Sequence, residues 1–314
     1  MKKKILVVIK ATPEEQEKLK KTAPNCEFLF TTISSVTQQQ VLDANLIIGS
    51  VPPKFLHDVP NLEWIQVQSA GTDAYVHVLP KRVLLTNATG AYGLAVSEHM
   101  LAMLLCMIKK LHLYRDHQTR GEWVDEGMVK TMEESRVLVV GLGDIGSHFA
   151  KKCKALGSYT VGLKRHIAET PDCVDELYNM DSLDEELGKA DVVAIFLPSA
   201  ENTTRLFDQQ PIARMKSDAV LLNGGSGPII DTQALCNALQ TESIGGACLD
   251  VTDPEPLPSD HPLWTMKNVL ITPHAAGSNH LAYTTHRIFE ICYRNLQNYI
   301  QNKPLHNLIK HGEN

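Results

Sequence analysis

The sequence predicts an α/β protein built from two doubly wound parallel-sheet domains, the second larger than the first. Short apolar runs alternate with longer amphipathic ones along the chain, as repeated strand–helix units require. Several of the runs are nearly continuously hydrophobic, which is typical of parallel strands covered on both faces. The 314 residues suggest two domains of roughly 150 residues each.

Five apolar runs predict the strands of the first domain, and they span residues 5–9, 27–33, 45–49, 62–68 and 83–87. The helix after the first run has a defined start, because Thr12 can cap it, Pro13 fits its first turn and Glu15 completes a capping box. We expect this domain to cover residues 1–95 and 283–314. The last helix, predicted over 278–302, would then cross back to it.

The second domain, predicted over residues 96–282, opens with a long helical pattern from Leu94 to Gln118 that is apolar over much of its surface. Such a helix is expected to be buried, against its own domain or another subunit. The polar segment HQTRGEWVDEG, residues 117–127, is expected to be irregular. Six apolar runs then predict a second parallel sheet: RVLVVG, YTVGL, DVVAIFLP, AVLLNG, GACLDV and NVLITP.

Composition narrows the class of protein. A formal charge of −6 argues against nucleic acid or an acidic membrane surface as a partner. The run ILVVI after Lys4 is too short for a signal peptide, and LAMLLCMI is far below the roughly 18 residues of a membrane span. The seven cysteines are scattered and never form CxxC. This pattern indicates a cytoplasmic protein whose thiols are reduced core residues, and it indicates no zinc site.

The sharpest motif is a glycine pattern between a predicted strand and a predicted helix. Gly141, Gly143 and Gly146 fit G-x-G-x-x-G. The first glycine permits a tight turn, the second lets the backbone approach a pyrophosphate, and the third lets helix and strand pack closely. Three turn glycines that bind nothing are the alternative. Because the helix N-terminus would face the phosphates, the context favours dinucleotide binding. The larger domain is therefore predicted to be a Rossmann-type dinucleotide-binding domain.

The end of the next predicted strand bears on the choice of dinucleotide. An NAD site places an acid there for the ribose hydroxyls, but this chain has Lys164 and Arg165. Two cations can pair with the 2′-phosphate of NADP, or they can be solvated loop charges. We favour NADP(H) as the cofactor and keep NAD(H) open.

Two polar residues are candidates for proton transfer. His274 follows one predicted strand and Glu255 stands on a proline-bounded loop after another. Histidine suits proton transfer near neutral pH, and a carboxylate on its second nitrogen would orient the ring. Most of the thirteen histidines are expected to be structural or solvated, but this one leaves the sheet at the expected cofactor edge.

At these residues the chain resembles the D-isomer-specific 2-hydroxyacid dehydrogenase family, which includes glyoxylate/hydroxypyruvate reductases and phosphoglycerate dehydrogenases. The resemblance covers nearly the whole length. The motifs that carry it, in family order and spacing, are QSAGTD, AVSEH, GLGDIG, FLPSAENTTRLF, LLNGGSGPIID, ACLDVTDPEPLP and TPHAAG.

The resemblance implies that His274 donates the proton during reduction and that Glu255 is its carboxylate partner. It also implies that the backbone N–H groups of Ala70 and Gly71 hold the substrate carboxylate in the first domain. The implied fold has two domains with a cleft between them, usually as a homodimer. The remaining implied contacts are with the cofactor, and they fall to Asp144, Ile145, Leu197, Pro198, Ser199, Asn223, Gly224, Gly225, Asp250 and Gly277.

The chain departs from the family pattern at one position of the LLNGGSGPIID motif. The family segment reads Asn-x-x-Arg-Gly, and its arginine grips the substrate; here Ser226 stands in that place. Replacing the two-pronged charged guanidinium of an arginine by a neutral hydroxyl typically loses about 1.5–3 kcal/mol of interaction free energy with the substrate. A cation from elsewhere can fill the gap, the substrate can do without it, or the chain is a weakened variant.

Two functions from different classes follow. The first is an NADPH-dependent reductase that converts a small 2-oxo acid to a D-2-hydroxy acid, with His274, Glu255 and Ser226 at the reacting centre. The second is a dinucleotide-binding sensor or scaffold, and Ser226 is the feature that favours it. The sequence does not specify the side chain of the acid.

Overall fold

The computed structural model describes residues 2–167, 169–278 and 280–309 and divides into two compact units. Unit 1 comprises Met1–Tyr92 and Asn279–Asn314, and unit 2 comprises Gly93–Ser278. The prediction placed the two boundaries after residues 95 and 282, whereas unit 2 begins at Gly93, where its first helix starts, and ends at Ser278.

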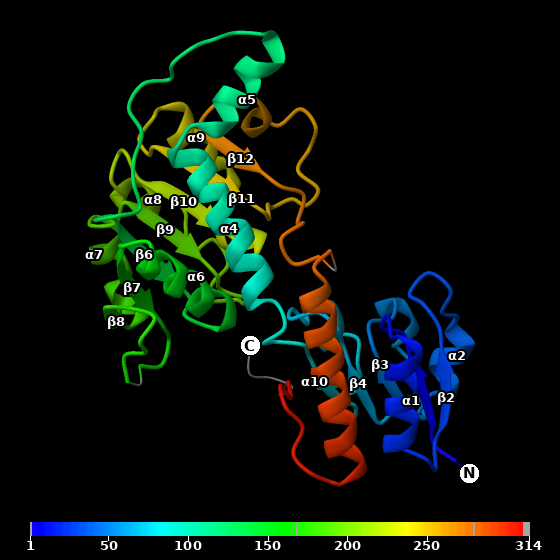
Figure 1. The fold of residues 1–314 in the computed structure, drawn as a ribbon. Helices are drawn as coiled ribbons and strands as arrows, with labels where there is room; N and C mark the ends of the chain where they lie inside the picture. The colour runs from blue at the N-terminus through cyan, green and yellow to red at the C-terminus, as the bar shows by residue number, and fades with distance from the viewer. Residues whose placement is uncertain (1, 168, 279, 310–314) are drawn as a thin grey trace. The chain divides into compact units, whose positions relative to one another are not determined.

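Unit 1 holds a five-stranded parallel sheet in the order β2-β1-β3-β4-β5 (Figure 1). Its strands are shorter than the predicted runs, because the ends of each run continue into the loops beyond the ladder. They are β1 Lys4–Val7, β2 Glu27–Phe30, β3 Leu46–Ile48, β4 Trp64–Gln66 and β5 Leu84–Thr86. The order is that of doubly wound flavodoxin-like sheets, which bind ligands beyond the carboxyl ends of the strands.

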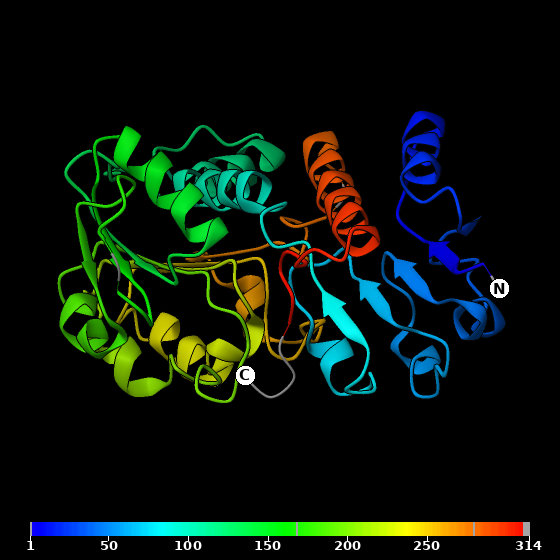
Figure 2. The ribbon, with the colours of Figure 1, turned by 90° about the horizontal axis from the view of Figure 1, so that it is seen from below.

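Helices cover both faces of this sheet (Figure 2). They are α1 Pro13–Thr22, α2 Gln38–Asp43, α3 Asp73–Val76, the short 3-10 helix η1 Pro53–Phe55 and α10 Ala282–Ile300. The predicted capping box is confirmed: the Glu15 N–H donates to the Thr12 hydroxyl and the Thr12 N–H donates to the Glu15 carboxylate.

The last helix ties the end of the chain to its beginning. Ile288, Phe289, Cys292 and Leu296 of α10 join one buried cluster with residues of β1, β3 and β4. Beyond the helix, the Ile309 N–H donates to the Leu85 carbonyl, so the chain returns to the sheet edge. α10 begins at Ala282, later than the predicted residue 278.

Unit 2 holds a seven-stranded parallel sheet in the order β12-β11-β10-β9-β6-β7-β8. The strands are β6 Arg136–Val140, β7 Tyr159–Leu163, β8 Glu176–Tyr178, β9 Val192–Ile195, β10 Val220–Asn223, β11 Gly246–Leu249 and β12 Val269–Ile271. The six predicted runs all form strands. The prediction missed β8, an edge strand of three half-buried residues, which is too short and too little buried to leave an apolar run.

The helices of unit 2 lie on both faces of its sheet, with α4 to α6 on one side and α7 to α9 on the other (Figure 2). They are α4 Gly93–Ile108, α5 Leu111–Arg120, α6 Asp144–Ala155, α7 Leu183–Leu187, α8 Gln209–Arg214 and α9 Thr232–Gln240. Three short 3-10 helices complete the set: η2 Met180–Ser182, η3 Gly227–Ile229 and η4 Pro262–Thr265.

One predicted helix, 94–118, is wrong as a single element. It is two helices, because Lys110 adopts a left-handed φ of 57° that ends the first and starts the second. Only α4 is buried along one side, while α5 has no buried residue. The irregular segment was expected to begin at His117, but the structure keeps α5 helical to Arg120.

Cysteine burial follows the prediction in part. Cys153, Cys236, Cys248 and Cys292 are buried core residues, whereas the other three are half-buried. Burial raises the pKa of the Cys153 and Cys292 thiols to about 12. These two thiols are therefore uncharged near neutral pH and act as small core groups.

Candidate functional site

Most of the predicted site residues leave one edge of the unit 2 sheet. β12, β11, β10, β9 and β6 are neighbours and run parallel, so their carboxyl ends lie side by side. The loops after them carry the glycine motif, residues 197–199, residues 223–226, Asp250 and His274. The geometry of these loops decides what the edge can bind.

The glycine loop after β6 has the shape of a phosphate cradle. Gly141 takes a φ of +98°, and a Cβ on Gly146 would lie 2.1 Å from the Gly141 carbonyl oxygen. A Cβ on Gly143, by contrast, would meet no atom within 4 Å. Asp144 and Ile145 then open α6, which has no side-chain cap, so the first-turn N–H groups stay available to an anion. This loop fits a pyrophosphate.

The neighbouring loops close around the same point. A Cβ on Gly141 would lie 2.9 Å from the Leu197 Cδ2 atom, and one on Gly225 would lie 2.5 Å from the Leu197 carbonyl oxygen. The loops after β6, β9 and β10 are therefore in direct contact through glycine backbone. Pro198 follows on the exposed side. Gly224 packs as tightly, since a Cβ there would lie 2.8 Å from the Met100 Cγ atom of α4.

Lys164 and Arg165 directly follow β7 and are both exposed. Within the described residues neither side chain forms an ion pair; the Lys164 backbone N–H donates to the Tyr178 carbonyl. The structure therefore leaves two uncompensated cations one strand away from the glycine loop.

Ser226 is held by its neighbours on both sides. Its hydroxyl accepts a hydrogen bond from the Ser199 N–H at 3.1 Å, and its carbonyl accepts one from the Asn223 Nδ2 atom at 3.0 Å. The Asn223 side-chain oxygen in turn accepts the Gly225 N–H at 3.1 Å. The hydroxyl therefore joins the loops after β9 and β10, a structural task that the sequence did not reveal.

The structure brings His274 and Glu255 together. The His274 Nδ1 atom lies 2.7 Å from the Glu255 Oε1 atom, although the residues come from loops after β12 and β11. Both side chains are exposed. An imidazole with one nitrogen on a carboxylate has a fixed ring and a second nitrogen available for proton transfer.

Asp250 supports the backbone that carries His274. Its buried carboxylate accepts the N–H groups of Ala275 at 2.9 Å and Ala276 at 3.1 Å, and it accepts the Thr272 hydroxyl. Its carbonyl accepts the His274 N–H at 2.8 Å. The cofactor contact that the resemblance implies for Asp250 would have to use the hydrogen-bonding capacity that these bonds leave free. Gly277 lies on the same loop.

Sequence reasoning gave no role to His99 and Thr272. The His99 Nε2 atom lies 2.9 Å from the Thr272 hydroxyl and 3.7 Å from Asp250. His99 belongs to the AVSEH motif on α4, so the motif was the available signal. The pair extends the support of the His274 loop into the helix layer.

Ala70 and Gly71 lie in unit 1, on the loop between β4 and α3. Neither backbone N–H donates to any residue in the described part of the chain, while the Ala70 carbonyl accepts the Asn87 amide at 2.6 Å and the Gly71 carbonyl accepts the Ser69 hydroxyl at 2.6 Å. The carbonyls are thus fixed and the two N–H groups are free. That arrangement suits a carboxylate.

Tyr92 also contacts the segment that leads into this loop. Its hydroxyl donates to the Gln68 carbonyl at 2.5 Å. Burial raises the pKa of Tyr92 to about 12, so the phenol keeps its proton near neutral pH. The hydrogen bond therefore does not depend on pH in the range where proteins of this kind are handled.

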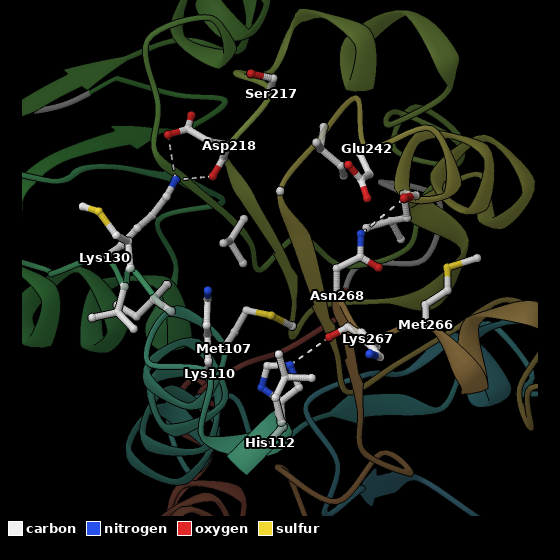
Figure 3. A pocket seen from close by; sticks show the side chains of 18 residues that line it. Met107, Lys110, His112, Lys130, Ser217, Asp218, Glu242, Met266, Lys267 and Asn268 are labelled. Carbon is white, nitrogen blue, oxygen red and sulfur yellow. Dashed lines mark hydrogen bonds and ion pairs between the residues drawn. The ribbon is translucent and has the colours of Figure 1, made fainter. Parts of the chain in front are cut away.

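A larger hollow, of about 600 Å³, lies elsewhere in unit 2, at the amino ends of β10 to β12 (Figure 3). Lys130 bridges to Asp218 across it at 2.8 Å, and the His112 Nε2 atom lies 2.8 Å from the Lys267 carbonyl oxygen. It contains none of the predicted site residues. Since parallel sheets bind at the carboxyl edge, this hollow is not the candidate site.

Comparisons with known proteins identify the family of the chain. The family model described as "D-isomer specific 2-hydroxyacid dehydrogenase, NAD binding domain" matches residues 101–276. This chain belongs to the D-isomer specific 2-hydroxyacid dehydrogenase family. Its enzyme class is therefore NAD(P)-dependent oxidoreductase, acting between 2-oxo and 2-hydroxy acids.

Individual proteins resemble most of the chain. Glyoxylate/hydroxypyruvate reductase B of Yersinia pestis is 30% identical over 240 residues, covering 74% of this chain and 73% of that protein. A family member from Aeromonas salmonicida has a TM-score of 0.86 at 29% identity, covering 98% and 99% of the two chains.

A third protein shares the fold at lower identity. The NADPH-dependent glyoxylate/hydroxypyruvate reductase of Sinorhizobium meliloti, solved with NADP and sulfate, has a TM-score of 0.82 at 24% identity, covering 99% of each chain. Among the helices of the described residues, none has the length and apolar character needed to cross a membrane.

Proposed function

We propose that this dehydrogenase works as an NADPH-dependent reductase that converts a small 2-oxo acid to the D-2-hydroxy acid. The observation that carries the proposal is the 2.7 Å pair of His274 and Glu255 on the sheet edge that also carries the glycine loop. A proton donor and a dinucleotide cradle on one edge suit the reduction of a carbonyl group.

The roles of the residues follow from what each one offers. The Gly141–Gly146 loop and the first turn of α6 would hold the pyrophosphate, with Leu197, Gly225 and Gly277 lining the same cradle. When bound, the cofactor supplies the hydride. The free N–H groups of Ala70 and Gly71 would hold the substrate carboxylate and thereby orient the carbonyl carbon.

Proton transfer falls to His274. In the charged form its Nε2–H would donate to the substrate oxygen while Glu255 holds the Nδ1–H and stabilises the imidazolium. In the reverse direction the neutral ring would accept the proton of the hydroxyl group. The Asp250 carboxylate keeps the loop in place in both directions.

Replacing the proton donor tests this mechanism. For His274→Gln we expect NADPH affinity to stay within about twofold and kcat for glyoxylate and hydroxypyruvate to fall by about 10²–10⁴, the usual share of general acid catalysis. NADPH absorbance measures turnover and fluorescence titration measures binding. His57→Gln, an exposed histidine of unit 1, is the matched control. Turnover that survives in His274→Gln would refute the role.

We also propose NADPH as the preferred cofactor, because Lys164 and Arg165 are exposed and uncompensated where an NAD site places an acid. The Sinorhizobium reductase of the same fold was solved with NADP, which supports the choice.

The double variant Lys164→Ser/Arg165→Ser should lower the ratio of kcat/KM for NADPH to that for NADH by about a hundredfold, because two charge-assisted contacts to the 2′-phosphate are lost. Steady-state rates with each coenzyme give the ratio. Arg115→Ser, on the exposed side of α5, controls for a general loss of positive charge. A ratio that stays constant in the double variant would show that both cations are solvated loop charges without a role in cofactor choice.

A dinucleotide-binding sensor or scaffold remains a second candidate function, because Ser226 occupies the position of the family's arginine. Ser226→Arg should raise kcat/KM for glyoxylate by about tenfold or more, since a charged fork replaces a hydroxyl. Ser226→Lys, a cation without the fork, should gain less. Strong activity of the unmodified protein would exclude the sensor, whereas turnover of no 2-oxo acid before or after the change would exclude the reductase.

We further propose that the chain forms a homodimer through the segment that follows α5. Trp123 is fully exposed and Met128 is 91% exposed, and large apolar side chains at a surface are typical of an interface. The segment is held in shape, because His117 lies 2.6 Å from both Glu122 and Glu126. A preordered surface loses less entropy on binding.

Sedimentation tests the dimer. The unmodified 34.8 kDa chain should sediment as a dimer at micromolar concentration, and Trp123→Ser/Met128→Ser should shift it to the monomer because the apolar contact is lost. Leu156→Ser, an exposed leucine after α6, should leave the dimer intact. A monomeric parent protein would contradict the proposal.

A further inference from the structure

A small hollow of unit 1 has the composition of a binding site that the proposed reaction does not use. Its volume is about 70 Å³, and it lies beyond the carboxyl ends of β1 and β4. Its lining is half polar and half apolar: Lys10, Gln68 and Thr285, with Ile9, Ile288 and Phe289.

The polar half of the lining has unused hydrogen-bonding capacity. In the described part of the chain, the side chains of Lys10, Gln68 and Thr285 form no hydrogen bond and no ion pair. Among the lysines of the same unit, Lys3 pairs with Glu63 and Lys18 with Glu290, whereas others, such as Lys81, also have no ion pair within the described residues. A lysine without a carboxylate beside a hollow is a free cation for a ligand.

The hollow is also at the positive end of a long helix. Thr285 belongs to the first turns of α10, a helix of 19 residues that begins without a side-chain cap. The first N–H groups of such a helix carry a partial positive charge. The neighbouring Thr284 hydroxyl is buried and has no partner among the described residues. No acidic side chain lines the hollow, so its field favours an anion.

The apolar half of the lining limits the size and type of the anion. Ile9, Ile288 and Phe289 are buried and offer contacts to methylene groups rather than to water. A single ammonium group matches a single carboxylate in charge, and a dianionic phosphate would need a further cation. The lining therefore fits a carboxylate at the end of a short alkyl chain.

The hollow lies next to the loop that would hold the reacting end of a substrate. Gln68 precedes Ala70 by two residues, so their Cα atoms are at most about 7.6 Å apart. The Tyr92 hydroxyl donates to the Gln68 carbonyl. This hydrogen bond helps to keep the distance between the hollow and the Ala70 loop constant. A chain of two or three carbons between two carboxylates spans a distance of this size.

We propose that this hollow binds the second carboxylate of a dicarboxylic 2-oxo acid, with Lys10 as the cation that selects it. The inference rests on the proposed function, because it takes the first carboxylate to lie on the N–H groups of Ala70 and Gly71. It assigns specificity to Lys10 and Thr285, residues outside the family motifs quoted above.

Two acids of equal length test the proposal, since 2-oxoglutarate has the terminal carboxylate that 2-oxopentanoate lacks. We expect the unmodified protein to prefer 2-oxoglutarate by about tenfold in kcat/KM, the range of one partly solvated charge-assisted contact. Lys10→Met should remove that preference, and Thr285→Val should reduce it by about threefold. Lys81→Met, an exposed lysine outside the hollow, should leave the ratio unchanged.

The outcomes separate this inference from the proposed function. Reduction of both acids without a preference, or a preference that Lys10→Met does not change, would overturn the assignment of the hollow while the reductase stands. Turnover of neither these acids nor glyoxylate, with either coenzyme, would overturn both. A preference for 2-oxoglutarate that only Lys10→Met and Thr285→Val reduce would support the proposal.

Discussion

The site of unit 2 depends on one buried carboxylate. Asp250 is 3% exposed, and a charge at that depth is costly unless hydrogen bonds satisfy it. The Ala275 and Ala276 N–H groups and the Thr272 hydroxyl do so, and they do it by folding the loop around the carboxylate. His274 is left at a φ of 51°, a conformation that an ordinary residue adopts only when its surroundings require it. The position of the imidazole is thus a consequence of satisfying Asp250.

Serine at position 226 has a similar structural logic. Its hydroxyl receives the Ser199 N–H, which ties two loops that a long side chain would leave to other contacts. Where the family has a charged side chain, this chain therefore has a hydroxyl that links the loops after two neighbouring strands. Within the described residues, Lys164 and Arg165 in one unit and Lys10 in the other have no carboxylate partner.

Local sequence signals predicted the parts that depend on local chemistry. The capping box at Thr12 and Glu15, the strand runs and the glycine turn at Gly141 each need only neighbours in the chain. The split at Lys110 could not be read, because nothing in the residue type requires a left-handed φ there. The strand β8 was missed because an edge strand packs on one side only.

The candidate site was predictable to the extent that family motifs name its residues. His274 and Glu255 were paired by resemblance, and they lie on the loops after the neighbouring strands β12 and β11. The support of Asp250 by backbone N–H groups, the His99–Thr272 contact and the hollow beside Lys10 depend on residues far apart in the chain. A pattern in one sequence carries no signal for such contacts, because each of these side chains has an ordinary role when read alone.

The division of unit 1 has a consequence for biosynthesis. Its strands come from the first 92 residues, but the helix that buries one face of them, α10, is made after the whole of unit 2. On the ribosome, the apolar surface that α10 will cover stays exposed while the middle of the chain is translated and folds. Transiently exposed surface of this kind makes a nascent chain prone to aggregation.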